Sequence, residues 1–145
     1  MIVRALLKTK ASMDVATARA DDGITAIAQL LHHKRIGALV VVDDERNIVG
    51  IISERDIARG LALYGLELHT LKVRDLMTSA VLVCTPDDTL EKLMEIMTNN
   101  RVRHLPVVEE GKLSGMISIG DVVKERLAEA TMQIDSLRNY VMAAR

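Results

Sequence analysis

The strongest constraint on the fold is an internal repeat that covers most of the chain. The segment DGITAIAQLLHHKRIGALVVVDD at residues 22–44 matches DTLEKLMEIMTNNRVRHLPVVEE at residues 88–110, an offset of 66. The offset becomes 65 after the next turn, where DDERNIVG is one residue longer than EEGKLSG. A polar turn is a place where a repeat tolerates an insertion. We therefore expect two copies of one structural unit.

Both copies carry the same periodicities. Apolar residues recur at i, i+3, i+4 and i+7, the stripe of an amphipathic helix; they are Ile24, Ile27, Ala28 and Leu31 in the first copy and Leu90, Leu93, Met94 and Met97 in the second. Short β-branched runs then predict two strands joined by a tight turn in each copy, at 38–42 and 48–52, and at 105–108 and 113–117. A helix should follow near 54–64 and 119–130, and an extended lead-in should precede at 14–18 and 80–85.

Each copy therefore predicts a β-α-β-β-α unit, which places the chain in the α/β (α+β) class. Units of about 65 residues are marginal alone, so the two should pack on one another. The predicted boundaries are 8–66 for the first repeat, 67–79 for a linker, 80–130 for the second repeat and 131–145 for a C-terminal helix. In the linker we expect Val73, Leu76 and Met77 to be packed, and Arg74 and Asp75 to be solvated.

Composition excludes several classes of function. The formal net charge is −1, Trp and Phe are absent and there are two Tyr, so a nucleic-acid partner is not expected. No run approaches the roughly 18 apolar residues of a membrane span, and the N-terminus is too short and polar for a secretory signal. We expect a cytoplasmic protein without a membrane partner. Cys84, the single cysteine, is expected to be a small buried residue.

Each copy ends its second strand in the same heptapeptide pattern, GIISERD at 50–56 and GMISIGD at 115–121. A Ser followed three residues later by an acid is typical of a helix start, worth about 1 kcal/mol. Capping does not account for the Gly and the two apolar residues before the Ser. They bring a strand directly to a helix N-terminus, where free N–H groups favour an anion such as phosphate. An Asp one turn into the helix can accept hydrogen bonds from paired hydroxyls.

Repeated β-α-β-β-α units that each end in this motif, with RVRHLPVVEE before the second, closely resemble the tandem cystathionine β-synthase (CBS) domain pair, or Bateman module. The resemblance covers about residues 10–130. It implies two repeats packed about a pseudo-two-fold axis, with two clefts that bind AMP, ADP, ATP, NAD or S-adenosylmethionine. It also implies a homodimer that forms a flat disc.

Carried onto this sequence, the resemblance assigns ribose binding to Asp56 and Asp121. Phosphate contacts would come from Ser53, Ser118, Arg55, Arg101, Arg103 and His104, and the adenine would lie against Thr17, Ile36, Val83, Val102 and Pro106. Because the first repeat has Arg35, Gly37 and Ala38 where the second has Arg101, Arg103 and His104, we expect the site at Asp121 to tolerate more phosphate charge. Arg55, inside the first heptapeptide, is a further candidate for phosphate contact and so weakens the argument for unequal charge. Solvation of the two arginines and burial of His104 in the core are the alternatives.

No catalytic motif accompanies the repeat, and neither a catalytic residue nor a metal site nor a required cofactor is expected. His32 and His33 should be exposed. The sequence thus predicts a non-catalytic regulatory module that binds an adenosine nucleotide and acts on a separate protein target. The alternative is an interaction module with empty clefts, whose S-x-x-D pairs only cap helices. The tail after residue 131 has the apolar residues of one more helix, which would cap the module, extend a dimer interface or dock a partner.

Overall fold

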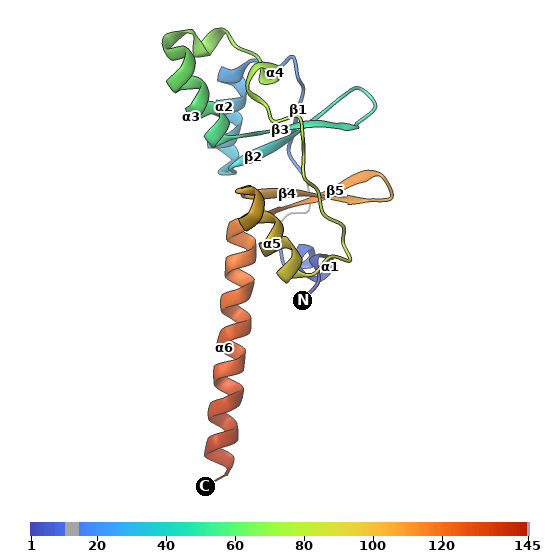
Figure 1. Cartoon of the computed structure of the whole chain (residues 1–145), viewed down its shortest axis with the longest axis vertical. Coiled ribbons are helices and arrows are strands. Elements are labelled where there is room, and N and C mark those ends of the chain that lie inside the picture. Colours follow the sequence, from blue (N-terminus) through green and yellow to red (C-terminus); the bar gives the residue numbers. More distant parts are fainter. Residues whose placement is uncertain (11–14, 145) are drawn as a thin grey trace.

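The computed structural model describes residues 1–10 and 15–144, and it shows the two repeats stacked with their hairpins side by side (Figure 1). The mixed α+β class is confirmed. The first repeat comprises β1 (Thr17–Ala18), α2 (Ile24–Lys34), β2 (Ala38–Val42), β3 (Ile48–Ser53) and α3 (Glu54–Tyr64). The second comprises α5 (Leu90–Asn100), β4 (His104–Glu109), β5 (Lys112–Ser118) and α6 (Ile119–Ala143). The predicted lead-in at 80–85 forms an isolated bridge, Cys84 to Val107, rather than a strand.

Pairing in the two sheets follows one plan. In the first, β1 is parallel to β2 and β2 is antiparallel to β3; in the second, β4 is antiparallel to β5. The register shifts at equivalent points, after Val41 and after Val107. The predicted helix stripes are buried, except that Met94 is 38% exposed and Ala28 is half-buried. Equal burial patterns in the two halves follow from the repeated sequence.

Two short helices are exchanged between the repeats, because each packs in the core of the repeat that it does not directly precede. The sequence pattern did not predict this exchange. Helix α4 (Val73–Leu76) precedes the second repeat but packs in the core of the first. Helix α1 (Val3–Lys8) precedes the first repeat but contributes Val3, Leu6 and Leu7 to the core of the second. In Figure 1, α1 accordingly lies beside α5.

The backbone hydrogen bonds of these helices match in detail. The N–H of Val73 donates to the Asp22 carbonyl, and the N–H of Val3 donates to that of Asp88, each at 2.9 Å. The sequence did hold a signal for this relation, because VRALL at 3–7 resembles VRDLM at 73–77. Each core is therefore built from two separated stretches of chain.

The repeated glycine of the heptapeptide pattern is explained by these helices. A Cβ at Gly50 would lie 2.7 Å from Sδ of Met77, and a Cβ at Gly115 would lie 2.7 Å from Cδ2 of Leu7. Met77 directly follows α4, and Leu7, at the equivalent position, is the last apolar residue of α1. Glycine is required at both positions because the last apolar residue of this short segment packs directly on the strand.

Two segments differ from the predicted boundaries. The linker is structured: a 3-10 helix spans Gly65–Thr70 and leads into α4, with Val73 buried, Leu76 and Met77 half-buried, and Arg74 and Asp75 exposed, as predicted. Helix α6 does not end near residue 130 but continues without a break to Ala143. No Gly or Pro occurs after Gly120, so nothing in the sequence stops the helix. No helix among the described residues is long and apolar enough to cross a membrane.

Candidate functional site

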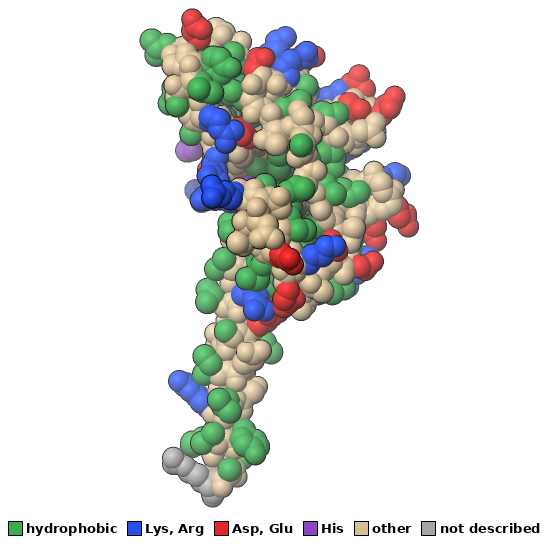
Figure 2. All heavy atoms as spheres, in the orientation of Figure 1, with side chains coloured by type: hydrophobic (Ala, Val, Ile, Leu, Met, Phe, Trp, Pro, Cys, Tyr) green, Lys and Arg blue, Asp and Glu red, His purple; other side chains and the backbone are tan. Residues whose placement is uncertain are grey.

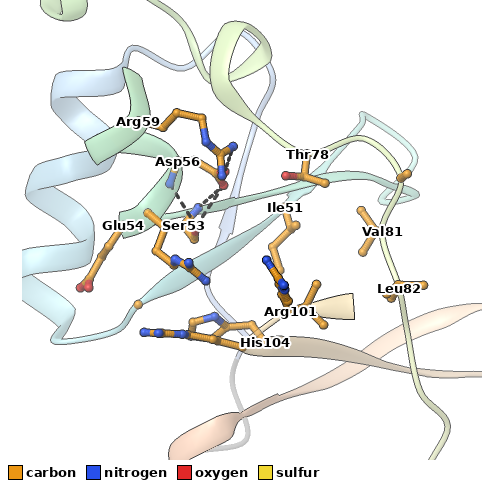
Figure 3. A pocket seen from close by; sticks show the side chains of 15 residues that line it. Ile51, Ser53, Glu54, Asp56, Arg59, Thr78, Val81, Leu82, Arg101 and His104 are labelled. Carbon is orange, nitrogen blue, oxygen red and sulfur yellow. Dashed lines mark hydrogen bonds and ion pairs between the residues drawn. The ribbon is translucent and has the colours of Figure 1, made fainter. Parts of the chain in front are cut away.

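A cleft of about 420 Å³ lies where the first repeat meets the second (Figure 3). One wall is the end of β3 and the start of α3. The opposite wall is the corner between α5 and β4, and the segment after α4 closes the side. Its lining residues are Gly37, Ile51, Ser53, Glu54, Arg55, Asp56, Arg59, Thr78, Ala80, Val81, Leu82, Arg101, Val102, Arg103 and His104. Both repeats therefore contribute to one site.

Asp56 is the buried carboxylate of this cleft, with a side chain that is 7% exposed. Its Oδ2 accepts hydrogen bonds from the N–H of Ser53 at 2.9 Å and from the Ser53 hydroxyl at 3.0 Å. The N–H of Asp56 in turn donates to Oγ of Ser53, which completes a capping box. Its Oδ1 has one partner among the described residues, Arg59 at 3.4 Å. One oxygen is thus fixed by the cap, while the other retains capacity to accept a hydroxyl group.

Arginines surround this carboxylate. Arg55 and Arg59 come from α3, and Arg101 and Arg103 come from the corner before β4. Figure 2 shows basic side chains gathered at the junction of the two repeats. With Asp56 and Glu54 as the acids, four guanidinium groups face two carboxylates at the positive end of the α3 dipole. The cleft has the charge and the planar donors that suit a phosphate group.

His104 lies at the floor of the cleft and is half-buried. Burial lowers its pKa below the ordinary value, although the carboxylates of Glu54 and Asp121 act in the opposite direction. The ring is therefore neutral at neutral pH and offers one donor and one acceptor. It also approaches Gly37 of the other repeat, where a Cβ would lie 3.0 Å from Nε2. Gly37 thus allows the two repeats to come together at this point.

The structure places three predicted phosphate contacts in the first cleft. Arg101, Arg103 and His104 come from the second repeat but line the cleft of Asp56. The backbone of Arg103 does contact its own repeat, because its carbonyl accepts from the N–H of Ile119 at 2.8 Å. Its side chain nevertheless lies in the cleft that the first repeat completes. Since the repeats face each other, the corner of one is brought against the helix start of the other.

The residues predicted to line the adenine separate in the structure. Val102 lines the cleft with Asp56, whereas Thr17, Ile36, Val83 and Pro106 are not among its lining residues. Pro106 is buried within β4, and Ile36 packs against the first core. The apolar wall consists instead of Ile51, Val81 and Leu82, which the sequence analysis did not select. Val81 and Leu82 face across the cleft from Asp56 and Arg59 (Figure 3).

The second S-x-x-D pair has the same cap but different surroundings. Ser118 and Asp121 form a capping box, with the N–H of Ser118 donating to Oδ2 of Asp121 at 2.9 Å. Nζ of Lys10 lies 2.8 Å from that same oxygen. Burial would raise the pKa of Asp121, but the hydrogen bonds from Lys10 and Ser118 outweigh it and hold the pKa below the ordinary value. The carboxylate therefore stays ionised and paired with an ammonium group of its own chain.

The other residues that the sequence singled out lie outside the cleft of Asp56. Cys84 is buried, as predicted, and desolvation raises the pKa of its thiol to about 12, which excludes a thiolate nucleophile at neutral pH. His32 and His33 are exposed at the end of α2, also as predicted. Within residues 1–10 and 15–144, no group of three or more His, Cys, Asp or Glu side chains is arranged to hold a metal ion.

Two equivalent units, each with a helix, a β-hairpin and a capped second helix, share a cleft and define a tandem-repeat α+β module. The family model for the CBS domain matches residues 3–63 and 73–128, and the chain belongs to the CBS domain family. The CBS-domain containing protein ATU1752 from Agrobacterium tumefaciens is 44% identical, with a TM-score of 0.84 over 87% of this chain and 99% of that one.

Two further similarities bear on this family. The mitochondrial CBS domain-containing protein CBSX3 of Arabidopsis thaliana is 34% identical over 83% of this chain, and the chain spans 61% of that relative's length. The structure of CBSX2 in complex with AMP is 25% identical, with a TM-score of 0.75 over 88% of this chain and 97% of that one. CBS pairs with this fold thus include one that binds an adenosine nucleotide.

Proposed function

We propose that this protein is a non-catalytic regulatory module that binds an adenosine nucleotide in the cleft between its two CBS repeats. The observation that carries the proposal is the buried Asp56 carboxylate with one weakly bonded oxygen, set among four arginines. A nucleotide needs this combination, since its ribose presents paired hydroxyls and its phosphate presents negative charge. AMP bound to a related CBS pair supports the same class of ligand.

The parts of the nucleotide can be assigned to the walls of the cleft. Oδ1 of Asp56 accepts from a ribose hydroxyl. The phosphate lies toward Ser53 and the start of α3, within reach of Arg55, Arg101, Arg103 and neutral His104. The adenine then lies on the apolar side formed by Ile51, Val81, Leu82 and Val102. This assignment keeps Arg55, Arg101, Arg103 and His104 as phosphate contacts but moves the last three to the first cleft, and it replaces most of the adenine residues predicted from the resemblance.

Binding in this cleft would change how the two repeats pack on each other, because the walls of the cleft come from different repeats. A ligand shifts the packing of the repeats only as far as its affinities for the two arrangements differ. A ligand that contacts both repeats would have different affinities for the two arrangements. The surface altered by its binding would then act on a separate protein target. The competing possibility is an interaction module with an empty cleft, in which Ser53 and Asp56 serve only as the observed cap.

A thermal-shift panel separates these possibilities. AMP, ADP, ATP, NAD and S-adenosylmethionine are compared with GTP as the non-adenosine control. A ligand at 100 times its dissociation constant should stabilise the native state by about 2.7 kcal/mol, which moves the unfolding midpoint visibly. We expect shifts with adenosine compounds and none with GTP. If no compound moves the unfolding midpoint at millimolar concentration, the hypothesis of an interaction module with an empty cleft replaces that of a nucleotide-binding module.

We further propose that the protein forms a homodimer to which α6 contributes. Beyond residue 122 this helix is covered by little of its own chain, and Figure 2 shows apolar side chains along its length. Those on one face follow alternating steps of three and four residues, as in a coiled coil: Val123, Leu127, Ala130, Ile134, Leu137, Val141 and Ala144. Parallel pairing would set Arg126 against Thr131 and Gln133 against Arg138, so no like charges face each other. A second copy of the same helix is therefore a suitable partner.

Replacing Leu137, which is 63% exposed, with Glu places a charge in the middle of this face. We expect Leu137→Glu to shift the mass measured by light scattering from dimer to monomer without loss of folded structure. Met132→Glu is the matched control, because Met132 is 69% exposed on the opposite face of the same helix. A dimer that survives Leu137→Glu, or that is lost equally in both variants, would contradict the assignment.

A further inference from the structure

We propose that Lys10 takes the place of a ligand at Asp121, in the second of the two clefts that the CBS resemblance implies, so that each chain binds one adenosine nucleotide rather than two. The inference rests on the proposed function of the first cleft. It begins from the unequal surroundings of two equivalent carboxylates, Asp56 and Asp121, which hold the same position in the same capping box.

The cation beside Asp121 is held more firmly than the cation beside Asp56. Nζ of Lys10 lies 2.8 Å from Oδ2 of Asp121, and both side chains are about three-quarters buried. Arg59 approaches Asp56 at 3.4 Å from its own helix, and its side chain is 65% exposed. An exposed arginine can swing aside for a ligand at little cost, because solvated ion pairs contribute little. A partly buried lysine has no such freedom.

Lys10 is anchored at a second point. Its Nζ donates to the carbonyl of Met116 at 2.7 Å. Met116 is the counterpart of Ile51, whose carbonyl accepts from the N–H of Thr78 at 2.9 Å in the first repeat. The ammonium group of Lys10 thus donates to the edge of β5 at the position where the backbone N–H of Thr78 donates to β3 in the first repeat. One side chain satisfies both the strand edge and the carboxylate.

Lys10 bonds Oδ2 of Asp121, the oxygen that the cap also holds, so it opposes a ribose by neutralising the carboxylate rather than by taking Oδ1. A hydroxyl approaching Asp121 must compete with a cation that neutralises the carboxylate, which a neutral donor does poorly. Displacing Lys10 would also leave the Met116 carbonyl without this donor. Of the cations that would attract a phosphate, Arg101 and Arg103 line the other cleft, and the equivalent corner of the first repeat has only Arg35, followed by the uncharged Gly37 and Ala38. The second cleft is therefore closed to the ligand by a residue of the same chain.

The test is the number of AMP molecules bound per chain, measured by isothermal titration calorimetry on the full chain. Wild type should bind one. Lys10→Met keeps the length of the side chain without its charge and should raise the number to two. Adding Asp121→Asn to Lys10→Met should return it to one. Lys8→Met is the matched control, because Lys8 is an exposed residue two positions away, and it should bind one.

Each other outcome overturns the proposal. Two AMP molecules bound to wild type would mean that Lys10 yields to the ligand or contacts its phosphate. One molecule bound to Lys10→Met would mean that the second cleft is closed for another reason. No binding to wild type would overturn the proposed function and, with it, this inference. Stoichiometry therefore separates failure of the inference from failure of the function.

Discussion

Asp56→Asn should weaken AMP binding by about 10- to 100-fold while the protein stays folded. The substitution removes the charge of the buried carboxylate but keeps its shape, and a hydrogen bond to a charged group is worth about 1.5–3 kcal/mol. The Asn oxygen can still accept from the N–H of Ser53, so most of the cap at the start of α3 remains. Calorimetric titration of AMP, combined with thermal unfolding without ligand, separates the loss of affinity from any loss of stability.

Asp75→Asn is the matched control. Asp75 occupies the same third position of a helix, and its Oδ2 accepts from the N–H of Lys72 at 2.9 Å, but it is exposed and lies outside the cleft. We expect AMP affinity to be unchanged in this variant. If Asp56→Asn binds AMP as tightly as Asp75→Asn does, the carboxylate acts only as a cap and the ribose assignment is wrong.

Leu6→Ala should lower the free energy of unfolding by about 2–5 kcal/mol, the cost of removing a buried leucine and leaving a cavity. Leu6 is 3% exposed in α1, within the core of the second repeat. Because α1 precedes the first repeat in sequence, a boundary between the repeats drawn from sequence alone would place it outside that core. Urea unfolding followed by circular dichroism measures the change.

The control for this variant is the same substitution on the surface. Leu66 is 91% exposed, so Leu66→Ala should change stability by less than about 0.5 kcal/mol. We also expect a single transition for Leu6→Ala, since the exchanged helices tie both cores together. A change as small as that of Leu66→Ala, or unfolding in two separate steps, would show that α1 does not belong to the second core.

Periodicity and the repeat were sufficient to predict the main elements. Apolar spacing predicted α2 and α5 because a helix that covers a sheet must bury one stripe. Helix α3 begins after Ser53 and α6 begins after Ser118, as the S-x-x-D pattern predicted, because these caps are local and depend on few residues. Both S-x-x-D pairs therefore form helix caps, as the alternative interpretation of the motif required. A cap is compatible with a second role for Asp56.

Features that depend on long-range packing were not predictable in this way. The exchange of α1 and α4 joins residues that lie far apart in sequence, although VRALL and VRDLM resemble each other. The position of Arg101 and Arg103 relative to Asp56 depends on how the repeats face each other. Lys10 lies 111 residues from Asp121, and nothing local in its sequence indicates their contact. Each of these features is set by the packing of one repeat on the other.

A crystal structure of the protein with AMP tests the central claim most directly. The account predicts one nucleotide per chain, with a ribose hydroxyl on Oδ1 of Asp56 and the phosphate within hydrogen-bond distance of Arg101 or Arg103. Lys10 should remain on Asp121 in the same crystal. A nucleotide found at Asp121, or a cleft at Asp56 that stays empty at saturating AMP, would contradict the account.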